Sequence, residues 1–344
     1  MNQDQPESGK RNSRSRLILI STNVVSLVCL YFVLRGSDLP RIWGELQHMN
    51  WWWVAIATIG DIAVYFWHGY RWRLVLRPVT DASFRDCVRA IYVGLFANEV
   101  LPLRSGEVIR CFLLGRWAEL PVSVSLASAL IERIFDGIWL CICLLITMQF
   151  VRLPKAMVDG GIFLAVLVFV CGALLAVAMY YKQETRVRFE NNKLLSKLTV
   201  LIDDLHLIGH SRYLYYAGLA SLPYLLLQVI PIYAVSIAYP GFDLTMGQAA
   251  AMMVMLRLGA VVPQAPGNLG LFQLIAVQGL LIFGIPGAMS RRFSFILWAV
   301  VTLPLLIVGF IALAITGMRM GQIHHDAHKS VSDRSRAGAP TTNI

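Results

Sequence analysis

The chain has 344 residues, of which 57% are hydrophobic and 15% charged, and its mean hydropathy is +0.62. Because a soluble surface usually needs about a quarter of the residues to be charged, this composition excludes a soluble globular protein and indicates an integral membrane protein. The formal net charge of +10 does not indicate a nucleic-acid partner, since the basic residues fall between long apolar runs and not on one soluble face. The six cysteines lie in or beside apolar stretches without CxxC or zinc-finger spacing, so we expect no metal and no cofactor there.

Apolar runs long enough to cross a bilayer begin after a polar segment over 1–16, which we expect to be disordered and cytoplasmic. Leu17–Leu34 contains 18 uncharged residues, and no cleavage site follows it, so it predicts a retained signal anchor. Five later runs complete six predicted spans: Trp51–His68, Val122–Val151, Gly161–Tyr181, Tyr213–Tyr239 and Phe293–Thr316. Residues 17–317 are therefore predicted to form a single transmembrane domain, followed by a disordered cytoplasmic tail over 318–344.

Two other apolar regions are interrupted near their middles by polar and helix-breaking residues. Cys87–Pro121 is interrupted over 98–107, and Thr245–Ile285 is interrupted over 263–270. Each region predicts a broken or re-entrant helical hairpin that enters and leaves on one side of the membrane. Sidedness leaves open whether each tip stops inside the bilayer or emerges on the far face. The predicted fold is an all-α polytopic membrane protein with about six full spans and two such hairpins.

The distribution of Lys and Arg orients these elements, because cytoplasmic loops hold an excess of basic residues. With the N-terminus inside, 20 of the 30 basic residues fall in cytoplasmic segments, 6 fall outside and 4 fall within hairpins or spans. Five of the cytoplasmic ones lie between Arg71 and Arg89. Both termini are thus predicted to be cytoplasmic, in a bacterial-type inner membrane.

The order of elements suggests an inverted repeat. Residues 17–151 run span, span, hairpin, span, and residues 161–316 run through the same elements with opposite orientation. Inverted repeats with broken helices that meet near the midplane are a recurring transporter architecture, and paired interrupted segments point to the binding site.

Ionisable residues at membrane depth are functional candidates, because a charge at the bilayer centre costs about 2.5 to 3.5 kcal/mol on the insertion scale. In the first hairpin, Pro102 and Gly106 free backbone N–H groups to face an anion, and arginines suit phosphate contact. The alternative is that Glu107 and Arg110, three residues apart, only neutralise each other at a helix end. The polar residues of this tip are Asn98, Glu99, Arg104, Glu107 and Arg110.

Two further clusters follow. Glu132, Arg133 and Asp136 lie about mid-depth in one span at helical spacing, which suits either function or an ion pair that locks the helix to the first hairpin. Arg257 has no acid nearby in sequence, so it needs an anionic ligand or a distant acid such as Glu132 or Asp136. Its hairpin carries four residues that make a sharp, non-helical tip: Pro263, Pro266, Gly267 and Gly270.

Asp61 and His68, on the second span, are weaker candidates; His68 is expected at the interface beside Arg71. The sequence contains no phosphate loop and no HExxH, GxSxG or dinucleotide-binding motif in a suitable context. An ATP-driven pump and the common soluble hydrolases and dehydrogenases therefore have no support.

Three motifs in this order resemble the lysylphosphatidylglycerol synthase transmembrane-region family, which comprises flippase-like integral membrane proteins, over about residues 17–317. They are Asn98-Glu99-x-x-Pro102-x-Arg104-x-Gly106-Glu107-x-x-Arg110, Glu132-Arg133-x-x-Asp136 and Pro263-x-x-Pro266-Gly267-x-x-Gly270. The resemblance implies lipid translocation across the inner membrane. Bifunctional members carry a cytoplasmic synthase domain after this region, and this chain has 28 residues after Thr316, so we expect no synthase activity.

The sequence thus predicts a translocase that binds an anionic lipid headgroup between facing hairpins, with Arg104, Arg110 and Arg257 on the phosphate. We expect membrane lipids as partners, with no metal site and no enzymatic activity. Two alternatives stay open: an intramembrane enzyme that modifies a lipid or polyprenyl carrier, and a non-catalytic partner in an envelope-lipid complex. A homo-oligomer is also compatible with the sequence.

Overall fold

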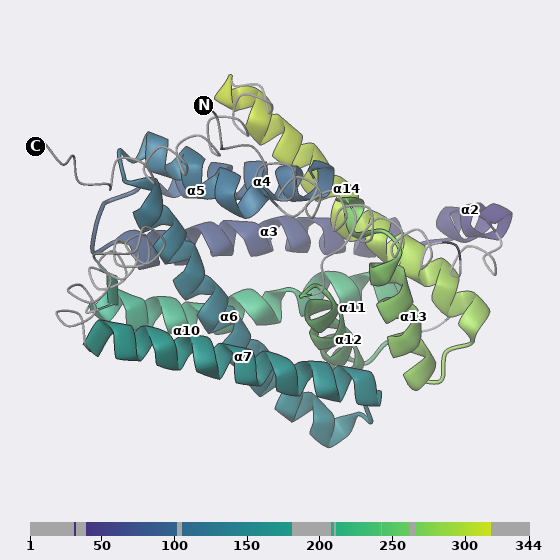
Figure 1. Ribbon diagram of the computed structural model, residues 1–344. Helices are drawn as coiled ribbons and strands as arrows, with labels where there is room; N and C mark the ends of the chain where they lie inside the picture. The colour runs from purple at the N-terminus through teal and green to yellow at the C-terminus, as the bar shows by residue number, and fades with distance from the viewer. Residues whose placement is uncertain are drawn as a thin grey trace, which may run out of the picture.

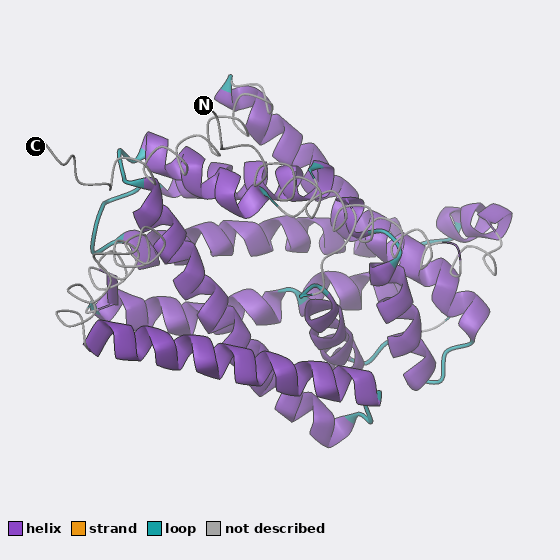
Figure 2. Cartoon of the chain, viewed as in Figure 1, coloured by secondary structure: helices purple, strands orange, loops and turns teal. Residues whose placement is uncertain are grey.

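The computed structural model describes residues 31, 39–101, 105–180, 208–209, 211–241, 243–261 and 266–317. The regular elements in this part of the chain are all helices (Figures 1 and 2). They are α2 (Leu39–Gln47), α3 (Trp51–Leu76), α4 (Phe84–Val100), α5 (Gly106–Trp117), α6 (Val122–Phe150), α7 (Lys155–Tyr180), α10 (Arg212–Leu227), α11 (Val229–Ala238), α12 (Met246–Gly259), the short 3-10 helix η2 (Pro266–Asn268), α13 (Leu271–Ile282) and α14 (Gly287–Thr316). The predicted all-α class is confirmed.

The helices occupy most of the predicted spans, but the number of membrane crossings stays a prediction. Within the described part, two helical stretches have both the length and the apolar composition to cross a bilayer: Arg212–Ala238 and Gly287–Thr316. The α3 and α6 helices are long enough but carry charged residues along their length. Of the first predicted span, only Tyr31 is described, and the predicted disordered ends, 1–16 and 318–344, lie outside the described residues.

The α3 helix is longer than its predicted span, because it continues eight residues beyond His68. Asn50 caps its N-terminus by accepting a hydrogen bond from Trp52 N at 3.1 Å. Beyond its C-terminus, Asp81 accepts hydrogen bonds from Arg73 at 3.0 Å and from Arg77. The hydrogen bond from Arg73, with the charge of Arg77, lowers the pKa of this exposed carboxyl.

The predicted span over 213–239 is broken in its middle. The α10 helix ends at Leu227 and α11 begins at Val229. Pro231 explains the break, because proline has no N–H to donate to the carbonyl of Leu227 and its ring crowds that carbonyl, whereas it is tolerated in the first turn of α11. The Gln228 side chain at the break donates to the Tyr224 carbonyl at 2.9 Å.

The first hairpin is formed by α4 and α5, which pack tightly against each other. Two glycines allow this, since a Cβ on Gly106 would lie 1.9 Å from the carbonyl oxygen of Gly94. Gly106 N donates to Asn98 Oδ1 at 2.9 Å and so ties the start of α5 to α4.

The second hairpin is formed by α12 and α13. Its tip contains Gly267 at φ 77° and Gly270 at φ 92°, backbone conformations that favour glycine. Gln273 stabilises the tip, because its Oε1 accepts a hydrogen bond from Gly270 N at 2.6 Å. The two glycine conformations and this hydrogen bond agree with the sharp, non-helical tip that the sequence predicts.

Each hairpin packs against the long helix that closes the other half of the chain. The α14 helix packs on α4 and α13 and also on α3, and α6 packs on α5, α10 and α12. Figure 1 shows α6 and α14 lying diagonally to the more nearly parallel α3, α4 and α10. One buried apolar cluster surrounds the first hairpin and a second surrounds α11–α13, so polar side chains between them are enclosed by both halves.

Candidate functional site

Six charged side chains from α3, α5 and α6 form a closed ring of alternating sign. In order around the ring they are Arg71, Glu132, Arg110, Glu107, Arg133 and Asp136, and every neighbouring pair lies within 4.0 Å. Each arginine therefore contacts two carboxylates and each carboxylate contacts two arginines. Three positive and three negative charges make the ring neutral as a whole, which offsets the cost of burying ions.

Glu132 in the charged ring has no exposed surface. Its Oε1 accepts from Arg71 Nε at 3.1 Å, and its Oε2 lies 3.1 Å from Arg110 Nη2. His68 Nε2 is 3.3 Å from the same carboxylate oxygen and 3.2 Å from Arg110 Nη1. The carboxylate of Glu132 thus joins α6 to α3 and to the first hairpin at once.

Arg71 is fully buried and fixes the ring to α10 as well as α6. It forms an ion pair with Asp136, donates to Ser221 Oγ at 3.1 Å, and lies 4.4 Å from the centre of the Tyr224 ring. These several contacts depend on the planar guanidinium, which presents donors in several directions; a lysine ammonium lacks this geometry.

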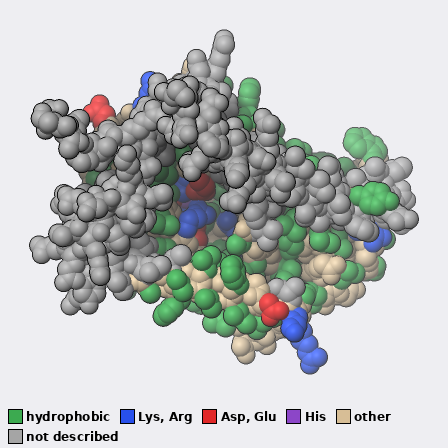
Figure 3. Space-filling model, in the orientation of Figure 1, with side chains coloured by type: hydrophobic (Ala, Val, Ile, Leu, Met, Phe, Trp, Pro, Cys, Tyr) green, Lys and Arg blue, Asp and Glu red, His purple; other side chains and the backbone are tan. Residues whose placement is uncertain are grey.

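Glu107 and Arg133 form the open side of the charged ring. Their side chains are 42% and 43% exposed, and their mutual distance of 3.8 Å is the longest in the ring. Both line a cavity of about 270 Å³ that lies between the hairpins. In Figure 3, acidic and basic side chains show in a hollow of the molecular surface, with hydrophobic side chains beside them.

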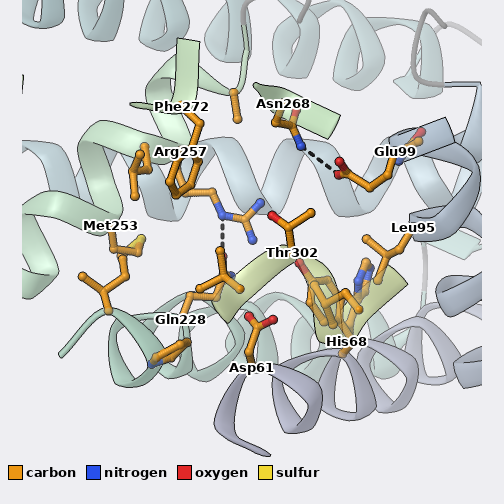
Figure 4. A pocket seen from close by; sticks show the side chains of 18 of the residues that line it. Asp61, His68, Leu95, Glu99, Gln228, Met253, Arg257, Asn268, Phe272 and Thr302 are labelled. Carbon is orange, nitrogen blue, oxygen red and sulfur yellow. Dashed lines mark hydrogen bonds between the residues drawn. The ribbon is translucent and has the colours of Figure 1, made fainter. Parts of the chain in front are cut away.

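Both halves of the chain line this cavity, which we call the central cavity. Its walls come from α3, α4, α5 and α6 of the first half and from α10–α14 of the second. The polar groups in the walls include Asp61, Glu99 and Arg257, which are labelled in Figure 4, together with Asn98 and Tyr224. One side of the cavity is apolar and is formed by α13 and α14, through Phe272, Ile275, Leu297, Val301 and Leu305.

Arg257 extends from α12 into the central cavity (Figure 4). It donates to Gln228 Oε1 through Nε and to the Tyr224 hydroxyl at 3.1 Å through Nη2. Both partners are neutral, and none of the ion pairs in the described part of the chain involves Arg257. The alternative in which Arg257 pairs with Glu132 or Asp136 is not observed, because those carboxylates pair with the arginines of the charged ring.

The tips of the two hairpins meet at the same cavity. Asn268 Nδ2 of the second hairpin donates to Glu99 Oε1 of the first at 2.8 Å (Figure 4). The Trp298 indole of α14 donates to the Gly267 carbonyl at 2.7 Å and so ties the second tip to α14. The two interrupted regions identified in the sequence are thus brought together in space.

Comparison with known proteins agrees with this architecture. A sequence model of the lysylphosphatidylglycerol synthase TM region matches residues 18–309. The chain belongs to this family. Two relatives are UPF0104 membrane proteins of Methanothermobacter thermautotrophicus: one is 22% identical over 309 residues, covering 83% of this chain and 89% of the relative, and the other is 24% identical over 174 residues, covering 49% and 48%.

A UPF0104 membrane protein of Methanocaldococcus jannaschii is 24% identical over 127 residues, which cover 36% of this chain and 37% of the relative. No solved structure matches the chain significantly. Membership in this membrane family, together with the apolar helices, places the protein in a membrane.

The predicted site residues fall into three groups in the structure. Asn98, Glu99, Glu107, Arg133 and Arg257 line the central cavity, and the backbone of Gly267 and Gly270 shapes the second tip beside it. Glu132, Asp136 and Arg110 belong to the charged ring. Pro102, Arg104 and Pro263 lie outside the described residues, and Pro266 is described only through its backbone.

The side chain of Arg110 is not among those that line the central cavity. The sequence places it on a ligand phosphate, but its side chain is 3% exposed, is paired with Glu107 and Glu132, and lies 4.7 Å from the centre of the Trp72 ring. The alternative interpretation, that Glu107 and Arg110 neutralise each other, describes the observed contact. Of the described arginines, Arg133 and Arg257 are the ones that face the cavity.

Sequence reasoning missed Arg71 and undervalued His68. The prediction placed Arg71 in a cytoplasmic loop and counted it among the 20 cytoplasmic basic residues, whereas it is buried in α3. His68, expected at the interface, is also buried. The signal that could have found both is the absence of proline between Trp51 and Leu76, which allows one helix to continue until just before Pro78.

Proposed function

We propose that this protein moves an anionic phospholipid headgroup across the membrane through the central cavity. The observation that carries the proposal is Arg257, a cation in a cavity at the meeting point of two hairpins, with neutral hydrogen-bond partners. A partly buried cation with no carboxylate within ion-pair distance favours an anion, and a guanidinium matches the geometry of phosphate. The name of the family and the region of the chain that it matches also support a lipid-related membrane role.

The size of the cavity suits a headgroup and not a whole lipid. Its volume of about 270 Å³ is close to the lower limit of ligand sites, which range over roughly 300–1,000 Å³. Arg133 also lines the cavity, and its side chain is 43% exposed although it contacts Asp136 at 3.5 Å and Glu107 at 3.8 Å. In this proposal the phosphate binds between Arg257 and Arg133, while the acyl chains stay outside the cavity.

The packing of the helices supports an inverted repeat. In this arrangement α4, α5 and α6 correspond to α12, α13 and α14, and α3 corresponds to α10 with α11. The closing helix of each half then packs on the opposite hairpin, as α14 does on α4 and α6 does on α12. Hairpins that enter from opposite faces and touch at their tips stop inside the bilayer, so rocking one half against the other exposes the cavity alternately.

The charged ring has a supporting role in this proposal. It fixes the first hairpin to α3 and α6, so that these elements move as one body, and Glu107 and Arg133 form the part of the ring that a ligand reaches. The lipid leaves chemically unchanged, because translocation needs no bond to be made or broken.

The test is lipid movement in phosphatidylcholine vesicles that contain the purified protein and a trace of NBD-labelled phosphatidylglycerol. Dithionite bleaches the label in the outer leaflet, so movement appears as loss of the protected fraction. We expect Arg257→Gln to abolish this movement and Arg116→Gln, an exposed arginine at the end of α5, to retain it. Equal movement by the wild type and Arg257→Gln, or recovery of a chemically altered lipid, would contradict the proposal.

A further inference from the structure

Asp61 is a buried carboxyl group that the proposed binding site does not use. It lies on α3 and lines the central cavity, its exposed fraction is 7%, and Figure 4 shows its carboxyl group directed toward the space that Arg257 enters. In the part of the chain that the structure describes, its Oδ2 is buried without a hydrogen-bond partner. An ionised carboxylate in this position needs a compensating charge, and without one it takes up a proton.

The compensating charge available to Asp61 is that of Arg257. The side chains of Asp61 and Arg257 both enter the central cavity (Figure 4), and the other described arginine that lines it, Arg133, is paired with Glu107 and Asp136. The other titratable groups near Asp61 are Tyr65 on the same helix and Tyr92 on α4, whose hydroxyl donates to the Ile62 carbonyl at 2.7 Å. The elements α11 and α14, which also pack on α3, contribute uncharged residues to the cavity here, such as Pro231 and Thr302.

The remaining ionisable groups of the cavity are engaged elsewhere. Glu99 accepts a hydrogen bond from Asn268, and His68 contacts Glu132 and Arg110. Glu107 and Arg133 are members of the charged ring, and the Tyr224 hydroxyl accepts from Arg257. Asp61 and a bound anion therefore compete for the positive charge of the same guanidinium.

We propose that Asp61 is a proton-binding site coupled to the anionic ligand. When the cavity is empty, the carboxylate is balanced by Arg257; when a phosphate binds Arg257, Asp61 takes a proton from water, and it returns that proton when the phosphate leaves. One negative charge and one proton then enter together, so the net charge of the cavity does not change. The inference rests on the proposed function and deepens it, because it makes headgroup movement dependent on proton movement.

The test measures protons taken up on binding of dihexanoyl phosphatidylglycerol, a water-soluble anionic phospholipid, to the purified full chain in a neutral detergent. Isothermal titration calorimetry in two buffers of different ionisation enthalpy gives the number of protons, and the ligand's phosphodiester does not titrate near neutral pH. We expect about one proton per bound lipid in the wild type and none in Asp61→Asn. Asp243→Asn, which removes an exposed carboxyl, is the matched control and is expected to keep the uptake.

The pH dependence of affinity is a second measurement that needs no variant. Between the pH at which Asp61 is half protonated in the empty protein and the higher pH at which it is half protonated in the complex, wild-type affinity is expected to fall by up to about tenfold per pH unit, because each bound lipid requires a proton. The Asp61→Asn variant is expected to bind with little pH dependence. Binding without proton uptake in the wild type, or uptake that persists in Asp61→Asn, would overturn the coupling and leave lipid binding intact. Failure of the wild type to bind the lipid would overturn the proposed function itself, and the coupling with it.

Discussion

Replacing Glu132 by Gln is the most informative perturbation of the charged ring. The substitution keeps the shape of the side chain but removes one of three negative charges, so that Arg71 and Arg110 share a charge deficit in a site with no exposed surface at position 132. Breaking a buried ion pair by removing one partner costs about 3–5 kcal/mol, which corresponds to a loss of roughly a hundred- to a few thousandfold in the folding equilibrium.

The assay is reversible unfolding in mixed micelles, followed by the change in tryptophan fluorescence as denaturing detergent is added. Glu119→Gln is the matched control, because Glu119 is exposed, and it is expected to change the free energy of unfolding by less than about 0.5 kcal/mol. The double variant Glu132→Gln with Arg110→Gln restores a neutral ring and is expected to be more stable than the sum of the two single effects. A loss below about 1 kcal/mol for Glu132→Gln, or strict additivity, would refute the account of the ring as a closed electrostatic unit.

Three further predictions follow from the structure. Gly106→Ala is expected to destabilise the first hairpin by about 2 kcal/mol or more, since its Cβ would overlap a backbone oxygen, whereas Gly247→Ala, with open space around it, is expected to stabilise the protein slightly; thermal unfolding measures both. Asp81→Asn is expected to lower Tm at pH 7 and to lose this effect below about pH 4. The pKa of Asp81 is lower in the folded state, so the ionised carboxyl stabilises the fold above pH 4, and this stabilisation is lost as the pH falls and the carboxyl takes up a proton. The buried thiols of Cys87 and Cys111 are expected to react with maleimide only after unfolding, which peptide mass spectrometry detects.

Local sequence signals predicted the interruptions of the helices well. Gly106 and the Pro-Gly segment around Gly267 change the backbone wherever they occur, so the two hairpins and the polar character of their tips could be predicted without knowledge of the rest of the fold. The closeness of the two tips was expected from the inverted order of the halves. The break between α10 and α11 was missed, although Pro231 carries its local signal, because the apolar run on both sides is continuous.

The partners of the charged residues could not be predicted in the same way. Arg71 follows an apolar run in a position where hydropathy alone places the end of a span, and only the packing of α6 against α3 supplies Glu132 and Asp136 as its partners. The neutral partners of Arg257 are Gln228 and Tyr224, which lie 29 and 33 positions earlier in the chain, at the end of α10 and at the break that follows it. Long-range pairing of this kind is decided by the free energy of the assembled helices and leaves little trace in local sequence.

We propose that the cavity between the hairpins holds an anionic phospholipid headgroup on Arg257. Native mass spectrometry of the protein after gentle extraction from its membrane is the most direct test, because it identifies the lipids that stay bound. We expect an anionic phospholipid to be retained by the wild type and by Arg116→Gln but lost from Arg257→Gln. Retention of the same anionic lipid by Arg257→Gln, or retention of uncharged lipids alone by the wild type, would contradict it.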